Sequence, residues 1–199
     1  MKDYKLNIFK DFLGIKNLIL TNSCTSALTL ALKISGVGPG TEVITTPMTC
    51  IATNTPIVNL GAKIVWADVY PENGSINPQE IEKKITKKTK AIIFVNWAGT
   101  PIALEKISEI GKKHKISTIQ DSAHSFGATW NNICTSNYTD YTCFSFQAIK
   151  HLSTGDGGAL VCKSNKSSIL ASKLKWFGFD RENAKDEKGN WKGQRWNED

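Results

Sequence analysis

One lysine of this chain stands where covalent chemistry is favoured. Lys150 ends a stretch, residues 144–150, that carries no other charged side chain and begins in an apolar segment. A lysine partly removed from water has a lowered pKa, and its free amine can attack a carbonyl carbon to form a Schiff base. Ser145, five residues earlier, could reach a phosphate group on the same ligand. Lys150 is therefore a candidate nucleophile, whereas most lysines of the chain lie in polar runs.

A carboxylate and a histidine follow a second apolar segment. Asp121 comes directly after residues 116–120. A carboxylate at the end of a strand is well placed to hold a cationic ring nitrogen. His124 follows three residues later, and it could hydrogen-bond a ligand from the same turn. A turn-forming aspartate and a half-buried structural histidine would explain the same residues, so the sequence leaves both interpretations open.

Two further segments are rich in small residues. Residues 21–27 open a helical pattern with hydroxyl side chains. Such a helix N-terminus suits a phosphate, although Ser and Thr are equally good as plain N-caps. Residues 153–159 hold three glycines, which permit close backbone approach beside the lysine or form an ordinary turn. Together the segments predict a pyridoxal-phosphate site with a phosphate cradle, a ring-nitrogen carboxylate and a Schiff-base lysine.

The elements that must position these residues alternate between strand and helix. The apolar runs predict strands at residues 42–45, 63–67, 91–95, 116–119, 141–146 and 159–162. Helical spacing predicts helices at residues 27–32, 53–60, 78–85, 101–114 and 169–175. This alternation, with short connections, is typical of a doubly wound α/β sheet, in which ligands bind at the carboxyl ends of the strands.

Composition narrows the class of protein. The chain has 199 residues and a net charge of +7, but its basic runs are not interleaved with aromatic residues, so we expect no nucleic-acid partner. No apolar run approaches the length of a membrane span, and the N-terminus lacks a signal core, so we expect a cytoplasmic protein without a membrane partner. Five widely spaced cysteines fit neither a disulfide framework nor a metal site.

As an ordered set, the motifs identify a family. The chain resembles the DegT/DnrJ/EryC1/StrS sugar aminotransferases, which are fold-type I pyridoxal-phosphate enzymes. The matching stretches are residues 22–28, 36–44, 49–54, 120–128, 144–150 and 155–159. The resemblance implies a three-layer α/β/α fold with a mostly parallel central sheet. It also implies that residues 1–180 form a cofactor-binding large domain, incomplete at both ends. Residues 181–199 would be an irregular polar tail, and the small C-terminal domain would be absent.

The resemblance also assigns roles to residues. Lys150 matches the lysine that forms the Schiff base and moves the proton between substrate and cofactor carbons. Asp121 matches the carboxylate that keeps the pyridine nitrogen protonated, and His124 falls near the cofactor's phenolic oxygen. The phosphate-binding positions are matched by Thr25, Ser26 and Ser145. Cys50 stands where relatives often carry an aromatic residue against the ring face.

The reaction implied is the transfer of an amino group, usually from glutamate, onto a keto group of a nucleotide-linked deoxysugar, as in polysaccharide biosynthesis. Relatives complete the active site across a homodimer interface. Two alternatives stay open: another fold-type I activity, such as a desulfurase or aldolase, and a catalytically incompetent fragment that acts with a partner chain. A nicotinamide-binding domain is disfavoured, because the glycines at positions 155–158 lead into a strand instead of a helix.

Overall fold

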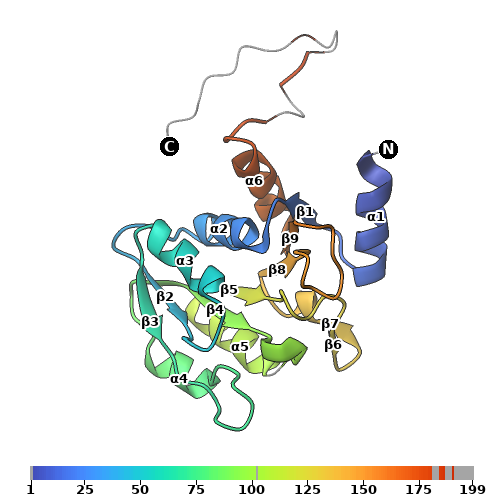
Figure 1. Cartoon of the computed structure of the whole chain (residues 1–199). Coiled ribbons are helices and arrows are strands. Elements are labelled where there is room, and N and C mark those ends of the chain that lie inside the picture. Colours follow the sequence, from blue (N-terminus) through green and yellow to red (C-terminus); the bar gives the residue numbers. More distant parts are fainter. Residues whose placement is uncertain (1, 102, 181–183, 187–189, 191–199) are drawn as a thin grey trace.

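A computed structural model describes residues 2–101, 103–180, 184–186 and 190. A seven-stranded sheet forms the middle layer, with helices on both faces (Figure 1). The strand order is β1-β9-β8-β5-β4-β2-β3. These strands are β1 (Leu18–Thr21), β2 (Glu42–Thr45), β3 (Lys63–Trp66), β4 (Thr89–Val95), β5 (Ser117–Asp121), β8 (Tyr141–Ser145) and β9 (Gly158–Cys162). Only β9 runs against its neighbours, which confirms the mostly parallel sheet.

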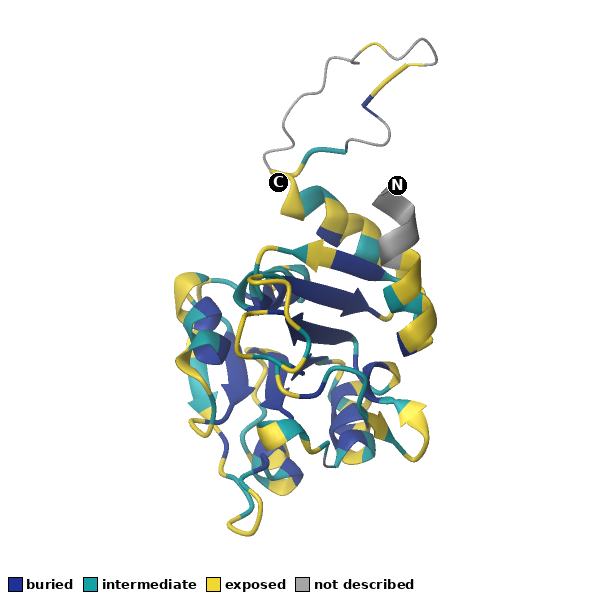
Figure 2. Ribbon diagram, turned by 45° about the vertical axis from the view of Figure 1, so that its right-hand side comes forward, coloured by how far each residue is buried: buried dark blue, intermediate teal, exposed yellow. Residues whose placement is uncertain are grey.

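Within the described residues, six α-helices cover the sheet. One face packs against α2 (Cys24–Ile34), α3 (Ile51–Asn59) and α6 (Asn165–Lys175). The other face packs against α1 (Lys2–Leu13), α4 (Pro78–Lys83) and α5 (Leu104–His114). The predicted three-layer α/β/α fold is therefore confirmed. The central strands are the most buried part of the molecule (Figure 2), as expected for a sheet covered on both sides.

Local sequence explains the elements nearest the pocket. In β4, residues 91–94 are at most 2% exposed, because an unbroken apolar run suits a strand buried on both faces. The side chain of Ser23 caps α2 by accepting a hydrogen bond from the backbone N of Ser26 at 3.1 Å. Asn77 caps α4 in the same way through the backbone N of Gln79, and Pro78 occupies the first turn. Asn at the N-cap and Pro in the first turn are both favoured at the start of a helix.

The structure also differs from the predictions. Helix α1 and the small hairpin of β6 (Thr129–Trp130) and β7 (Ile133–Cys134) were not predicted. The helix predicted at 101–114 begins only at Leu104, and Asp121 is the last residue of β5 instead of the first residue after it. Most of the predicted tail, 181–199, lies outside the described residues.

Candidate functional site

A pocket of about 430 Å³ opens at the carboxyl ends of β4, β5 and β8, where an open α/β sheet places ligands. Its volume lies within the range of small-molecule sites. The residues predicted from the sequence that line it are Thr25, Asp121, His124, Ser145 and Lys150, and Cys50 lines it as well. Ser26 lines a neighbouring surface pocket instead. The fold therefore brings five of the six predicted site residues together from segments far apart in the chain.

Asp121 lies in this pocket with its side chain 4% exposed. Its Oδ2 accepts a hydrogen bond from the hydroxyl of Thr53 at 2.7 Å. Its Oδ1 accepts one from the backbone N of Ala123 at 3.0 Å and a longer one from the thiol of Cys24 at 3.8 Å. Burial raises the pKa of the Asp121 carboxyl, and the hydrogen bond from Thr53 opposes that rise.

Two basic groups share the pocket with this carboxylate. The side chain of Lys150 is half-buried, and its positive charge lowers the pKa of Asp121. The pKa of His124 is lowered, first by burial and then by Lys150. His124 is therefore a neutral imidazole at neutral pH, able to donate or accept a hydrogen bond. Its ring lies 5.8 Å from that of Trp97.

The N-terminus of α2 forms one wall of the pocket. Its first residues, Cys24 and Thr25, line the cavity, and the N–H groups of a first helical turn point at whatever binds there. Gly158 of β9 lies directly against this turn, since a Cβ at that position would meet the carbonyl carbon of Ser23 at 2.3 Å and the nitrogen of Cys24 at 2.5 Å. Only glycine allows β9 to approach the helix start this closely.

The sequence analysis gave no role to Thr53 and Trp97, which both line the pocket. Thr53 lies in the first turn of α3, and its hydrogen bond to Asp121 spans 68 positions of the chain. Trp97 follows β4 just as His124 follows β5, so its place beyond a strand end could have drawn attention to it. No local pattern could have indicated that Thr53 donates to Asp121.

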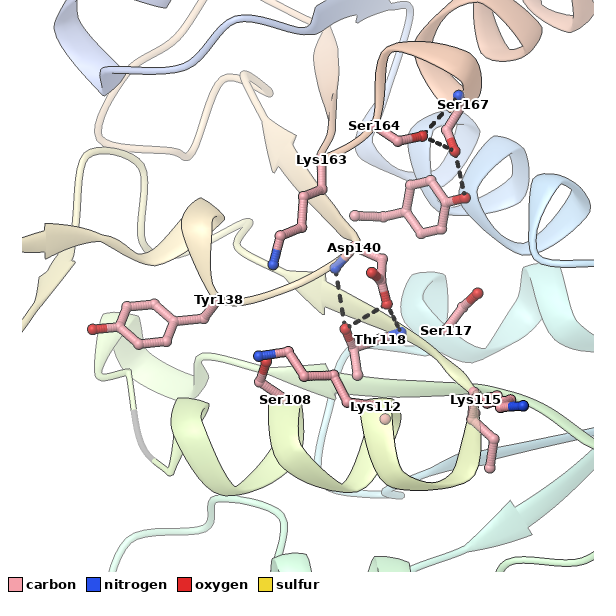
Figure 3. A pocket seen from close by; sticks show the side chains of 13 residues that line it. Ser108, Lys112, Lys115, Ser117, Thr118, Tyr138, Asp140, Lys163, Ser164 and Ser167 are labelled. Atoms are coloured by element: carbon pink, nitrogen blue, oxygen red, sulfur yellow. Dashed lines mark hydrogen bonds between the residues drawn. The ribbon is translucent and has the colours of Figure 1, made fainter.

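A second pocket, of about 360 Å³, lies at the amino ends of β5 and β8 (Figure 3). Here Oδ2 of Asp140 accepts hydrogen bonds from the backbone N of Thr118 at 2.9 Å and from its hydroxyl at 3.0 Å. The side chains of Lys112 and Lys163 extend to one side of this carboxylate and Lys115 to the other. All three lysines are exposed. The Asp140 carboxylate stabilises the start of strand β5 through its hydrogen bonds to Thr118. The three lysine side chains extend into solvent.

Two negative findings apply to the described part of the chain. It contains no group of three or more His, Cys, Asp or Glu that could hold a metal ion. Within the same residues, no helix combines the length and apolar character needed to cross a membrane. All five cysteines are free thiols.

The fold and the pocket together define an α/β protein with a lysine and a buried aspartate at the carboxyl ends of its strands. Residues 7–195 match the DegT/DnrJ/EryC1/StrS aminotransferase family. The chain belongs to this family, so the predicted resemblance is confirmed.

Individual relatives agree with this assignment. The chain is 37% identical to the spore coat polysaccharide biosynthesis protein SpsC of Bacillus subtilis, over 84% of this chain and 42% of SpsC. It is also 37% identical to UDP-2-acetamido-2-deoxy-3-oxo-D-glucuronate aminotransferase of Pseudomonas aeruginosa, over 86% of this chain and 48% of that enzyme. Among solved structures, NtdA of Bacillus subtilis with the bound cofactor PMP is similar, with a TM-score of 0.80 and 26% identity over 85% of this chain and 38% of NtdA. The chain thus spans less than half the length of these relatives.

Proposed function

We propose that this chain is the cofactor-binding part of a pyridoxal-phosphate-dependent aminotransferase that acts on nucleotide-linked sugars. One observation carries the proposal: the half-buried Lys150 and the buried Asp121 share a pocket whose wall is the N-terminus of α2. Residues 1–180 would form the large domain, with the rest of the chain leading out of it.

The residues of the pocket fit both ends of pyridoxal phosphate, the ring nitrogen and the phosphate group. A carboxylate has about four acceptor positions, and three of those on Asp121 are taken by Thr53, Ala123 and Cys24. The remaining position, on Oδ2, suits the N–H of a pyridinium ring. At the other end, the first turn of α2 offers N–H groups and the Thr25 hydroxyl to a phosphate, with Ser145 also on the lining.

Each side chain then has a definite task. Bound pyridoxal phosphate supplies an aldehyde carbon that takes up amines and a ring that withdraws electrons. Lys150 would supply Nζ, the amine that could hold that carbon as a Schiff base and carry a proton beside it. Asp121 keeps the ring nitrogen protonated. Neutral His124 would hydrogen-bond the ring hydroxyl oxygen, and Thr25 and Ser145 would hold the phosphate.

The substrate class follows from the relatives. The Pseudomonas aeruginosa relative is named for a UDP-linked keto sugar and SpsC for polysaccharide biosynthesis. We therefore propose amino transfer onto a keto group of a nucleotide-linked deoxysugar, with glutamate as the donor, in a homodimer of the full-length protein. The five free cysteines support a location in the reducing cytoplasm.

A visible spectrum of the purified chain with added pyridoxal phosphate tests the proposal, followed by borohydride reduction and peptide mapping. We expect a new visible absorption band and a single reduced adduct on Lys150. Labelling scattered over the exposed lysines, or none, would contradict the proposal.

A further inference from the structure

The hydroxyls of Thr49 and Thr53 form a hydrogen-bonded series that ends on the Asp121 carboxylate. The Oγ1 atoms of Thr49 and Thr53 lie 2.7 Å apart, and Oγ1 of Thr53 lies 2.7 Å from Oδ2 of Asp121. Thr53 lies in the first turn of α3, and Thr49 lies in the segment just before that helix. Thr53 is 1% exposed, whereas Thr49 is only half-buried at the pocket lining. This series of hydrogen bonds therefore runs from the pocket lining to the buried Asp121 carboxylate.

The direction of these hydrogen bonds depends on the charge of Asp121. A hydroxyl has one proton to donate. When Asp121 is ionised, Thr53 must give that proton to Oδ2, so Thr49 must donate to Thr53. When the carboxyl is protonated, the same three groups can point the other way. A chain of aligned donors stabilises the ionised form most, because hydrogen bonds to a charged group are the strong ones.

Other groups also face this carboxylate. Two are basic, His124 and Lys150, and they favour its ionised form. Two are thiols, Cys24 and Cys143, and burial raises the pKa of both so that they stay neutral. Within the described residues, the side-chain hydroxyl that donates to Asp121 is that of Thr53.

We propose that Thr53, held by Thr49, is a positioning residue that keeps the Asp121 carboxylate ionised and leaves one acceptor position of Oδ2 open to a ligand N–H. The inference rests on the proposed function for the identity of that ligand, a protonated ring nitrogen. The link between Thr53 and Asp121 itself needs no cofactor, so it can be measured in the chain alone.

The first experiment titrates Asp121 in the cofactor-free chain by the ¹³C chemical shift of its carboxyl carbon. Thr53→Val removes the hydroxyl but keeps the shape, and we expect it to raise the pKa of Asp121 by about one unit. Thr53→Ser restores the donor and should bring the pKa back to within about 0.3 unit of wild type. Thr49→Val leaves Thr53 in place, so it should give a smaller rise in the same direction and provides a second test if Thr53→Val unfolds.

The matched control is Thr118→Val, which removes the comparable hydroxyl bond to Asp140 in the second pocket. It should leave the Asp121 titration unchanged. A Thr53→Val chain that is folded and titrates like wild type at Asp121 overturns the inference. So does a rise in the Thr118→Val variant of the same size.

The second experiment measures the affinity for pyridoxal phosphate by visible titration. At a pH below the Asp121 pKa found in the first experiment, one pKa unit changes the ionised fraction of Asp121 about tenfold. Thr53→Val should there bind pyridoxal phosphate about tenfold more weakly, and Thr53→Ser like wild type. If the wild-type chain forms no adduct on Lys150, the proposed function fails, while the Asp121 titration still decides the role of Thr53. If the adduct forms and Thr53→Val binds pyridoxal phosphate as tightly as wild type, the proposed role of Thr53 in ligand binding is wrong, while the proposed function stands.

Discussion

The two pockets lie at opposite ends of the same central strands and contain the same kinds of groups. Each holds an aspartate that accepts hydrogen bonds from a threonine hydroxyl and a backbone N–H, and each has lysine on its lining. The hydrogen-bond donors to Asp121 come from α2, α3 and the turn after β5. The carboxylate of Asp140, in contrast, accepts both of its hydrogen bonds from Thr118. Asp121 is buried and Asp140 is only half-buried.

This difference separates a ligand site from a structural contact. Burial raises the pKa of Asp121, so its negative charge destabilises the chain unless a cation offsets it. A protein keeps such a group where a ligand supplies that cation. Asp140 is only half-buried, and its carboxylate anchors the start of β5. The comparison predicts that matched substitutions at the two ends will have different effects.

The largest difference should come from the lysines. Lys150→Ala should abolish the reduced pyridoxal-phosphate adduct completely, because the only half-buried amine in the pocket lining is removed. Lys163→Ala removes an exposed lysine from the second pocket and should leave the adduct unchanged. Borohydride reduction and peptide mapping of both variants measure this. If wild type and Lys150→Ala carried equal amounts of the reduced pyridoxal-phosphate adduct, the first pocket would not differ from the second in binding the cofactor covalently.

The next difference concerns two glycines. A Cβ on Gly158 would collide with backbone atoms at the start of α2, the nearest at 2.3 Å, so Gly158→Ala should cost about 2–4 kcal/mol of unfolding free energy. A Cβ on Gly111, in the second pocket, would meet the Cγ2 of Thr118 at 2.5 Å and the backbone O of Ile116 at 3.0 Å. Because alanine also favours the helix, Gly111→Ala should cost only about 1 kcal/mol.

Urea unfolding measures both costs, and a visible titration with pyridoxal phosphate measures binding. Displacing the first turn of α2 should weaken cofactor binding in Gly158→Ala, whereas Gly111→Ala should bind as wild type does. Unaltered binding in a folded Gly158→Ala chain would show that the contact between β9 and α2 does not shape the site.

The comparison also explains what could be predicted from sequence. Six strands of the seven-stranded sheet were predicted because their apolar runs are local, whereas β1 was not predicted as a strand. Asp121, Ser145 and Lys150 lie at or just beyond strand ends that a parallel sheet brings to one edge. Helix α1 was missed because lysines and an aspartate interrupt its apolar positions.

The electrostatic environment of the site could not be read from the sequence. The bond from Thr53 to Asp121 joins residues 68 positions apart, and nothing in residues 49–54 marks one threonine as a donor to a carboxylate. Burial of Asp121 likewise depends on α2 and α3 packing against the sheet. The difference between Asp121 and Asp140 therefore arises from tertiary structure, since both residues end or precede a strand.

The smallest difference is expected in the pH dependence of stability without cofactor. The pKa of Asp121 is raised in the folded chain, so its stabilising effect is present below the pKa of the unfolded chain and is lost as the pH rises through the folded pKa. Asp121→Asn removes this loss while keeping the shape. We expect it to be more stable than wild type at neutral pH, with the gain disappearing as the pH falls towards about 4.

Asp140→Asn should act in the opposite direction. It weakens two hydrogen bonds that a charged acceptor strengthens, and should cost about 1 kcal/mol at neutral pH. Urea unfolding of both variants from pH 4 to pH 8 measures the two effects. Destabilisation by Asp121→Asn at neutral pH would mean that Lys150 and the hydrogen bonds to Asp121 already offset the buried charge. The negative charge of Asp121 would then be balanced within the protein, without a cationic ligand. Asp121 and Asp140 would differ only in how far they are buried.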